Sequence, residues 1–498
     1  MTGPETHRRR LDLTALPRVD PSLRPAVLPD GVGIVHLGVG AFHRAHQAVF
    51  TEDAMAACDD GQWGICGVAP RGTAPVAALR PQDGLYTVLA RGADGTHARV
   101  LGPLREVLHA GSDAAALTDR IAAPDTRIVS LTVTEKAYPR DPATGGLRTD
   151  DPAIVADLAG GSPRSVIGML TRGLLARAHA DAGPITIVSC DNLAGNGPTL
   201  ARLVAEYAAC LPPAQAAALR AWLPDNTRFP ATMVDRIVPA ATDTDRAEAA
   251  HRLGVTDAAA VATEPFRQWV IQDDFAAGRP GWERAGALLV ADVAPYERMK
   301  LRLLNGAHSA LAYLGILAGH ATVAGAVSVP ELAELVRRLM AEDAAPTLTG
   351  LAGFDLPGYQ DSLLARFANP HLRHRTAQIA ADGSQKLPQR LLAPIRERLT
   401  AGASARWLTL AVAAWARYVS AQRADDGTPL GVDDPLARVI AERVTDPRDA
   451  AATVRVLART GVFGPALTDD PAFIGPITEW LDRLISDGAA TTVRMAVR

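Results

Sequence analysis

The search for chemistry in this chain starts from its lysines. Only three of the 51 basic residues are lysines, namely Lys136, Lys300 and Lys386, and the others are arginines. A buried lysine can lose its proton near neutral pH, whereas an arginine in a protein stays charged. We therefore expect any acid–base chemistry of the chain to use one of these three amines.

The segment KLRLLNGAH, from Lys300 to His308, gathers polar side chains that could act on a hydroxyl group. On an α-helix, at about 100° per residue, Asn305 lies roughly 140° and His308 roughly 80° around from Lys300, so the three share one side. Burial near Arg302 would lower the pKa of the lysine and let it act as a general base on an alcohol. Asn305 could donate to the alkoxide and His308 could orient the substrate. The alternative is a solvated helix face with a core histidine.

Three further segments carry candidate binding residues. Asn192 follows the predicted parallel strand 185–190, at the edge of the sheet where ligand crevices of α/β proteins form. Asp235 and Arg236 follow a loop proline and could bind substrate or simply neutralise each other. A group of cations around a turn suits either a substrate carboxylate or a solvated surface. This group consists of Arg373, His374, Arg375, Lys386 and Arg390.

A glycine turn follows the first predicted strand, 33–39, and precedes the helix-compatible stretch 43–57. Glycines at such a turn allow the backbone to approach a dinucleotide pyrophosphate closely. His43 stands where the usual fingerprint has a third glycine, so an ordinary tight turn remains an alternative at this point. The candidate cofactor-binding residues are Leu37, Gly38, Val39, Gly40, Ala41, Phe42, His43 and Arg44, together with Arg71 after the second strand.

The end of the second predicted strand, 63–68, bears on the choice of dinucleotide. An acidic residue there usually holds the adenosine ribose hydroxyls of NAD, and an arginine can accommodate the 2′-phosphate of NADP. The strand is followed by Ala69-Pro70-Arg71 without an acid. The residues by themselves therefore favour NADP, and the alternative is that Arg71 is only a solvated loop cation.

The hydrophobic pattern predicts an α/β fold followed by a helical part. Short apolar stretches read as strands of a mainly parallel sheet with helices between them. These stretches are 33–39, 63–68, 86–89, 127–134 and 185–190. Beyond residue 296 the pattern turns helical, at 297–319, 330–341, 359–367, 387–401, 405–424 and 450–460. We expect an N-terminal domain over residues 1–290 and a mostly α-helical domain over residues 291–498.

Composition excludes several classes of protein. With 498 residues, 48% of them hydrophobic, the chain can bury a large core, and a net charge of −3 gives no general attraction to nucleic acid. The four cysteines have neither disulfide-scaffold nor zinc-ligand spacing, so we expect no metal site. The start of the chain lacks the apolar core of a signal peptide, and the apolar stretch 310–329 reads as a core helix. We therefore expect a cytoplasmic protein without a nucleic-acid or membrane partner.

Longer motifs contain these candidate residues. They are IVHLGVGAFHRAHQAVF, IVSLTVTEKAY, SCDN, FPATMVDRIVP, EPFRQWVI and MKLRLLNGAHS. With them, nearly the whole chain resembles the mannitol dehydrogenase family, the polyol-specific long-chain dehydrogenases that include fructuronate reductase. The resemblance implies an N-terminal Rossmann-type NAD(P)-binding domain with additions, followed by a helical catalytic and substrate domain. It makes NAD the expected cofactor and leaves NADP open.

The resemblance also implies roles for individual residues. It implies zinc-independent catalysis by Lys300, with Asn192 and Asn305 binding the alkoxide and His308 assisting. Asp235 and Lys386 would line the substrate cleft, and Arg375 is a further substrate-binding candidate. A small-molecule sugar acid or polyol is the expected partner, and we expect a monomer.

The stretch LRHRTAQIAADGSQKLPQRLL looks more like the fructuronate reductase branch than like mannitol 2-dehydrogenases, in which an arginine typically stands where Gln378 does here. We therefore expect a secondary alcohol and ketone of the D-mannonate/D-fructuronate type as substrates. A polyol dehydrogenase, such as a mannitol 2-dehydrogenase or D-arabinitol 4-dehydrogenase, is the alternative. A non-catalytic nucleotide-binding regulator is the alternative of a different class, but a sensor would need the glycine turn and not Lys300.

Overall fold

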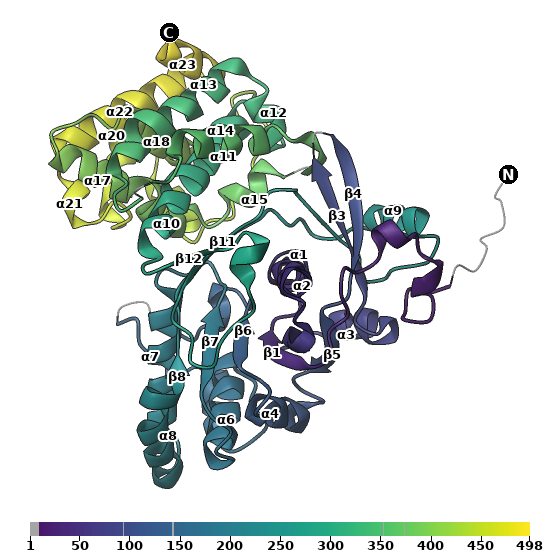
Figure 1. The fold of residues 1–498 in the computed structure, drawn as a ribbon. Coiled ribbons are helices and arrows are strands. Elements are labelled where there is room, and N and C mark those ends of the chain that lie inside the picture. Colours follow the sequence, from purple (N-terminus) through teal and green to yellow (C-terminus); the bar gives the residue numbers. More distant parts are fainter. Residues whose placement is uncertain (1–8, 93, 142–143, 352, 373) are drawn as a thin grey trace. The chain divides into compact units, whose positions relative to one another are not determined.

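The structure is a computed structural model, and it describes residues 9–498 except 93, 142–143, 352 and 373 (Figure 1). The chain divides into two compact units, Met1–Ala294 and Pro295–Arg498. No helix in the described part of the chain has the length and apolar character needed to cross a bilayer.

A six-stranded parallel sheet forms the centre of the N-terminal unit. Its strand order is β5-β2-β1-β6-β7-β8, and every neighbouring pair is parallel. The strands are β1 (Val32–Leu37), β2 (Gly64–Ala69), β5 (Leu104–His109), β6 (Ile128–Leu131), β7 (Ile185–Ser189) and β8 (Thr227–Arg228). The chain order reverses beside β1, between β2 and β6, which makes the carboxyl end of β1 the topological switch point of a Rossmann-type sheet. The predicted fold class is confirmed.

Alternating strand residues pack on two different cores. Ile34 and Ile65 belong to one hydrophobic cluster, which also contains residues of α2 (Gln47–Cys58). Their chain neighbours Val35 and Cys66 belong to a second cluster, in which several helices cover the other face. Because both faces of the sheet are covered, its long central strands are mostly apolar. The helices contributing to the second cluster are α4 (Ala114–Ala122), α5 (Pro152–Leu158), α6 (Val166–His179), α7 (Asn196–Ala209) and α8 (Pro213–Asn226).

Two small sheets complete the N-terminal unit. One has the order β10-β3-β4 and the other β12-β11-β9. Their strands are β3 (Tyr86–Gly92), β4 (Gly95–Leu101), β10 (Val261–Thr263), β9 (Thr232–Asp235), β11 (Gln268–Gln272) and β12 (Leu288–Val290). The stretch 86–89, predicted in the main sheet, is therefore in a different sheet. Its antiparallel pairing with β4, the next strand along the chain, explains the difference.

The first helical stretch also differs from its prediction. Instead of one helix over 43–57 there are α1 (Ala41–Ala45) and α2, because His46 has φ −126° and ψ −86° and breaks the helix. The third helix, α3 (Ala74–Leu79), follows β2, and α9 (Asp243–Leu253) follows β9. A Thr242–Asp245 capping box starts α9.

The C-terminal unit consists of helices around α11 (Gly306–Leu317) and α18 (Arg406–Ala421). Every residue of α11 is buried, as expected for a helix that is apolar on all sides. The surrounding helices include α10 (Ala294–Met299), α12 (Val323–Val327), α13 (Pro330–Arg338), α14 (Leu356–Phe367), α15 (Thr376–Ala380), α16 (Gly383–Leu387), α17 (Ala393–Thr400), α19 (Ala437–Arg443), α20 (Ala450–Arg459), α21 (Pro465–Thr468), α22 (Pro471–Ser486) and α23 (Ala489–Val497). Among the described residues of this unit, π-helical segments interrupt the α-helices at Lys300–Asn305, Leu339–Ala344 and Pro388–Leu392.

Candidate active site

A pocket of about 260 Å³ lies at the switch point of the N-terminal sheet. The glycine turn 38–40, the end of β2 at 69–72 and the end of β6 at 132–134 form its walls, with Pro75, Ala137 and Val166. Gly38 has φ +110°, and a side chain there would collide with the carbonyl oxygen of Thr132. Only glycine allows this approach of the two backbones, so the sequence of the turn sets the shape of the pocket.

The structure brings some of the predicted cofactor residues to this pocket. Gly38, Val39, Gly40 and Arg71 line it, and Arg71 is exposed. The backbone carbonyl of Arg71 accepts a hydrogen bond from His109 Nε2 at 2.9 Å. A glycine-lined pocket at this point of a Rossmann-type sheet suits the pyrophosphate of a dinucleotide.

The other predicted cofactor residues have different surroundings. The side chain of Leu37 is in the hydrophobic core. Ala41 and Phe42 are half-buried, and the Phe42 ring stacks on His46 with centroids 5.1 Å apart. Buried Arg44 directs its guanidinium to the carbonyl oxygens of Gly40 and Ala259 and not to the pocket.

His43, the remaining predicted cofactor residue, is buried and stacks on His36 with ring centroids 3.4 Å apart. The Thr132 hydroxyl donates to the carbonyl of Gly38 at 2.9 Å and lies 2.7 Å from His36 Nε2. His36 Nε2 therefore carries the proton, and Nδ1 accepts from the Ser130 hydroxyl 2.8 Å away. Burial lowers the pKa of His36 to about 3, so this ring is neutral and links β6 to the glycine turn.

Asn192 lies just beyond the carboxyl end of β7 and is exposed. Its neighbour Asp191 is a residue that the sequence did not single out. Asp191 is buried, and its Oδ1 accepts hydrogen bonds from the backbone N–H groups of Val133 and Thr134 at 2.9 and 2.8 Å. A buried acid directly after an apolar strand was the only signal of this role in the sequence.

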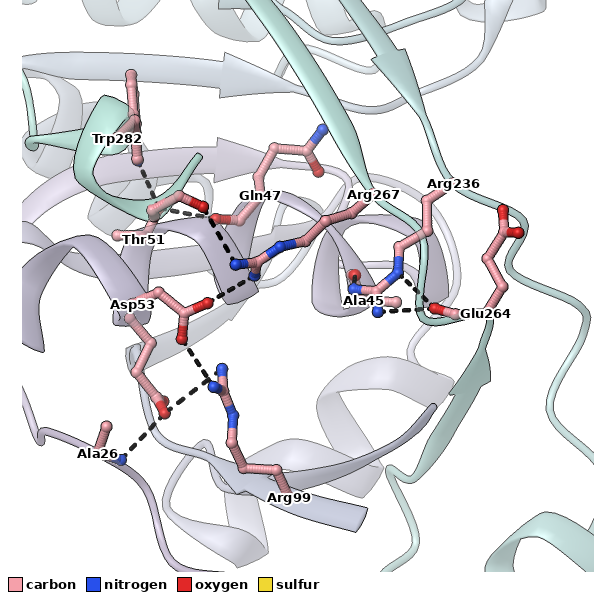
Figure 2. A network of polar contacts seen from close by, with 12 residues as sticks. Ala26, Ala45, Gln47, Thr51, Asp53, Arg99, Arg236, Glu264, Arg267 and Trp282 are labelled. Carbon is pink, nitrogen blue, oxygen red and sulfur yellow. Dashed lines mark hydrogen bonds and ion pairs between the residues drawn. The ribbon is translucent and has the colours of Figure 1, made fainter. Parts of the chain in front are cut away.

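Asp235 and Arg236 do not form an isolated ion pair. Asp235 is the last residue of β9 and lies opposite Gln268 of β11 in the sheet. The Arg236 guanidinium instead donates to the carbonyl oxygens of Ala45 and Glu264, as Figure 2 shows. Because Ala45 ends α1, Arg236 fixes the strand end that carries Asp235 to the helix after the glycine turn.

A second part of the same network holds α2. Asp53 bridges two arginines, accepting from Arg99 Nη1 at 2.7 Å and from Arg267 Nη1 at 2.6 Å (Figure 2). Arg99 belongs to β4, and Arg267 immediately precedes β11. Asp53 therefore connects α2 to both small sheets.

In the C-terminal unit, Lys300 and Asn305 are the first and last residues of a π-helical segment. The predicted single helix 297–319 is thus wrong in this part, because the hydrogen bonds over Lys300–Asn305 run from i to i+5. A π turn holds more residues than an α turn. The angle around the helix axis between Lys300 and Asn305 is therefore smaller than the roughly 140° of an α-helix. Lys300 is buried and Asn305 half-buried. Such π turns in helices are frequently found at functional sites.

Arg302, the cation predicted to lie near Lys300, is held by an ion pair. Its Nη1 and Nη2 donate to the two carboxylate oxygens of Glu397, each at 2.6 Å, and Nη1 also donates to the carbonyl of Thr347 at 2.8 Å. The carboxylate balances the guanidinium charge. The expectation that Arg302 lowers the pKa of Lys300 stays a prediction.

His308 is buried in the first turns of α11. Its ring contacts Phe367, with centroids 4.5 Å apart, and meets the His374 ring edge-on at 5.3 Å. Burial, followed by the charges of His374, Arg366 and Arg390, lowers the pKa of His308 well below its usual value. His308 is consequently neutral at neutral pH and can act as a hydrogen-bonding group.

Members of the predicted cation group lie at three places: Arg375 is the N-cap of α15, Lys386 lies on α16, and Arg390 lies on the following π segment. Lys386 Nζ donates to the carbonyl oxygens of Ala381 at 2.5 Å and Ile379 at 3.5 Å. Arg390 Nη1 donates to the Ser309 hydroxyl at 3.3 Å, and Arg375 is exposed. Arg373 lies outside the described residues. Among the residues that are described, no three His, Cys, Asp or Glu side chains are grouped as metal ligands would be.

Comparison with known families agrees with this arrangement. Residues 32–284 match the model of the mannitol dehydrogenase Rossmann domain, and residues 292–485 match the mannitol dehydrogenase C-terminal domain. The chain belongs to the mannitol dehydrogenase family. It is therefore an oxidoreductase of that family, as its motifs predicted.

Relatives within the mannitol dehydrogenase family have different named activities. D-mannonate oxidoreductase of Escherichia coli (strain K12) is 44% identical over 466 residues, which cover 92% of this chain and 94% of the relative. Mannitol 2-dehydrogenase of Pyrenophora tritici-repentis is 39% identical, over 93% of this chain and 81% of the relative. The structure of Pseudomonas fluorescens mannitol 2-dehydrogenase in complex with NAD and D-mannitol has a TM-score of 0.84 at 34% identity, covering 98% of this chain and 99% of that one.

Proposed function

We propose that this chain is an NAD-dependent dehydrogenase that interconverts a secondary alcohol and a ketone on a sugar acid, with Lys300 as the acid–base group. The observation that carries the proposal is the buried lysine on a π turn shared with Asn305, one turn before a neutral histidine. A solvated helix face would not bury Lys300 and His308. No regulatory nucleotide-binding function requires a buried amine in this place.

Each of the proposed site residues would have its own role in the reaction. When bound, the dinucleotide supplies or accepts the hydride. Lys300 Nζ would take the proton of the alcohol during oxidation and return it to the oxygen during reduction. The amide groups of Asn305 and Asn192 would donate hydrogen bonds to the developing alkoxide. Neutral His308 would hold the substrate hydroxyl by a hydrogen bond, which leaves the proton transfer to the lysine.

The pocket at the switch point is the proposed dinucleotide site. Gly38, Val39 and Gly40 offer backbone without side chains that obstruct the pyrophosphate, and Arg71 stands at the end of β2. The complex of the related mannitol 2-dehydrogenase contains NAD, which supports NAD as the cofactor. The absence of an acid after β2, with exposed Arg71 in its place, leaves use of NADP open.

A sugar acid is the proposed substrate class. D-Mannonate oxidoreductase is 44% identical to this chain, and a mannitol 2-dehydrogenase is 39% identical. Exposed Arg375 and half-buried Lys386 and Arg390 offer positive charge for a carboxylate, and Asp235 would bind substrate hydroxyls. A polyol dehydrogenase is the second candidate, favoured by the likeness to the complex with D-mannitol.

A substrate panel tests the proposal. Fructuronate, tagaturonate, fructose and xylulose would each be reduced with NADH and with NADPH while the nicotinamide absorbance is followed. We expect the fastest turnover with a ketose acid and NADH. Faster turnover of fructose would assign the chain to the polyol dehydrogenases, and nucleotide binding without turnover of any substrate would contradict the enzymatic proposal. Light scattering during size-exclusion chromatography would test the expected monomer.

A further inference from the structure

We infer that Asp191 is a positioning residue of the dinucleotide pocket, because its carboxylate holds Thr134 in a strained backbone conformation that shapes the pocket wall. The inference rests on the proposed function, since it takes the pocket at the switch point to be the dinucleotide site. Asp191 itself does not line that pocket, whereas Thr132, Val133 and Thr134 do.

The backbone of Thr134 has φ 71° and ψ 155°. This region is almost restricted to glycine, and a β-branched residue there is an outlier. Other non-glycine residues with positive φ behave differently: Asp59 and Gln422, for example, have ψ of 45° and 30° and lie in the ordinary left-handed region at helix ends. Thr134 therefore needs surrounding interactions that hold it in place.

Asp191 supplies these interactions. One carboxylate oxygen accepts hydrogen bonds from the N–H groups of two successive residues, Val133 and Thr134, at 2.9 and 2.8 Å. The other accepts the Tyr138 hydroxyl at 2.7 Å, and that hydroxyl also lies 2.7 Å from Ser189 Oγ. Hydrogen bonds to a carboxylate are stronger than those between neutral groups. The two backbone bonds, made to one buried atom, fix the direction in which the chain leaves β6.

Residues 132–134, whose backbone Asp191 holds, form the pocket wall that faces the glycine turn. The Thr132 carbonyl approaches Gly38 so closely that no side chain fits between them, and the Thr132 hydroxyl donates to the Gly38 carbonyl at 2.9 Å. Relaxation of Thr134 toward an ordinary conformation would move residues 132–134 relative to the glycine turn. The dinucleotide would then lose part of its preformed site, although no residue touching it had been changed.

The test is a cycle of four proteins, namely the unmodified chain, Asp191→Ala, Thr134→Gly and the double variant. The dissociation constant of NADH would be measured by fluorescence titration, and the melting temperature would be recorded for each. We expect Asp191→Ala to weaken NADH binding about tenfold or more, the usual effect of losing hydrogen bonds to a charged group. In the Thr134→Gly background the loss should fall to about threefold or less, because glycine adopts this conformation without strain.

Asp257→Ala is a matched control. Asp257 is also buried and accepts three hydrogen bonds, from Gln82 Nε2 at 2.8 Å, Thr87 N at 2.6 Å and Ala259 N at 2.7 Å, and none of these residues lines the pocket. Its loss should lower the melting temperature and leave the NADH dissociation constant unchanged. An equal effect of Asp257→Ala on NADH binding would overturn the inference, because general destabilisation would then explain both variants.

Two further results would overturn the inference. One is an NADH affinity of Asp191→Ala close to that of the unmodified protein, and the other is a loss of the same size with and without the Thr134→Gly substitution. If Asp191→Ala does not fold, Asp191→Asn takes its place in the cycle, since the amide keeps one neutral acceptor and should give a smaller loss with the same rescue. Failure of the unmodified protein to bind NADH would contradict the proposed function, and is distinguishable from failure of the inference.

Discussion

Arg302 and Glu397 form a two-point ion pair in which each guanidinium Nη atom lies 2.6 Å from a carboxylate oxygen. The Arg302 side chain is 6% exposed and that of Glu397 41% exposed. The pair links the π segment that carries Lys300 to α17, and the Thr347 carbonyl takes a further hydrogen bond from Arg302. Arg302 therefore fixes the segment that holds the proposed acid–base group.

Because Arg302 is more deeply buried than Glu397, we expect removal of either partner to lower the free energy of unfolding by a different amount. Glu397→Leu leaves a buried guanidinium without its counter-charge, and we expect the free energy of unfolding to fall by about 2–3 kcal/mol. Arg302→Leu leaves a carboxylate that water can reach, and we expect a loss of about 1 kcal/mol. Urea denaturation would compare the two. Glu442→Leu, which removes an exposed partner of Arg438, should change stability by less than about 0.5 kcal/mol. Equal losses in the first two variants would contradict this account.

Removal of the Lys300 amine should abolish turnover. Lys300→Met keeps a side chain of similar length without a titratable group, and Lys300→Arg keeps a charge that cannot be lost as a base. We expect kcat to fall well over tenfold in both, with NADH affinity close to that of the unmodified protein. Arg337→Met, a change of an exposed cation on α13, is the control and should retain activity. More than about a tenth of the original kcat in either lysine variant, a barrier change below ~1.4 kcal/mol, would refute the assigned role.

The two asparagines should act on the chemical step. Asn305→Ala and Asn192→Ala each remove one proposed donor to the alkoxide, and loss of one preorganised donor typically lowers kcat by about 10²-fold or more. Steady-state kinetics with the preferred ketose would separate kcat from KM. A change confined to KM would make these residues substrate-binding groups that act equally on ground and transition states.

The sequence predicted some elements well for a physical reason. Strands β1, β2, β6 and β7 begin and end within three residues of their predicted positions, because strands buried on both faces are mostly apolar. The glycine turn was also predicted from the sequence, and Gly38 in it has the positive φ that the close approach of Thr132 requires.

Contacts between residues far apart in the sequence could not be predicted from it. The hydrogen bonds of Asp191 reach residues 57 and 58 positions earlier in the chain. Arg44 and Arg236 resemble ligand-binding cations in the sequence, but both are satisfied by carbonyl oxygens brought to them by folding. The π segment at Lys300 has the same apolar periodicity as an α-helix over so short a stretch, so the sequence predicted the wrong helix type there.

A buried acid makes the stability of the N-terminal unit depend on pH. Burial raises the pKa of Glu52 to about 7, against a usual value of 4.5, although Arg99 and the N–H groups of Gly102 and Ala26 oppose the shift. The folded state therefore holds a proton that the unfolded state releases. This stabilisation is complete below about pH 4.5 and is lost as the pH rises through 7.

Glu52→Gln should remove this dependence. In the unmodified protein we expect the free energy of unfolding to fall by up to about 3 kcal/mol between pH 4.5 and 8, measured by urea denaturation at several pH values. Glu52→Gln should flatten this part of the profile. Glu283→Gln alters a half-exposed acid of the same unit and should keep the original slope. A profile unchanged by Glu52→Gln would show that this carboxyl group is not the source.

The last prediction concerns the substrate. A hexuronate differs from a hexitol chiefly by its terminal carboxylate, and a hydrogen bond to a charged group contributes ~1.5–3 kcal/mol. We therefore expect kcat/KM for fructuronate to exceed that for fructose by at least ~10-fold. In Lys386→Met the gap should shrink, because one candidate cation is lost. Lys386 Nζ also donates to the Ala381 carbonyl, so Lys386→Met could instead loosen the turn and lower kcat/KM for both ketoses by the same factor.

Arg375→Met separates these two explanations, since Arg375 is exposed. If charge recognises the substrate, Arg375→Met should also narrow the gap between fructuronate and fructose while the melting temperature stays unchanged. If both variants lower kcat/KM for fructuronate and fructose by the same factor, the cation group supports structure and does not select a sugar acid. A preference of the unmodified protein for fructose would reject the sugar-acid assignment. It would leave the proposed lysine mechanism intact, because the role proposed for Lys300 is at the alcohol group that hexuronates and hexitols share.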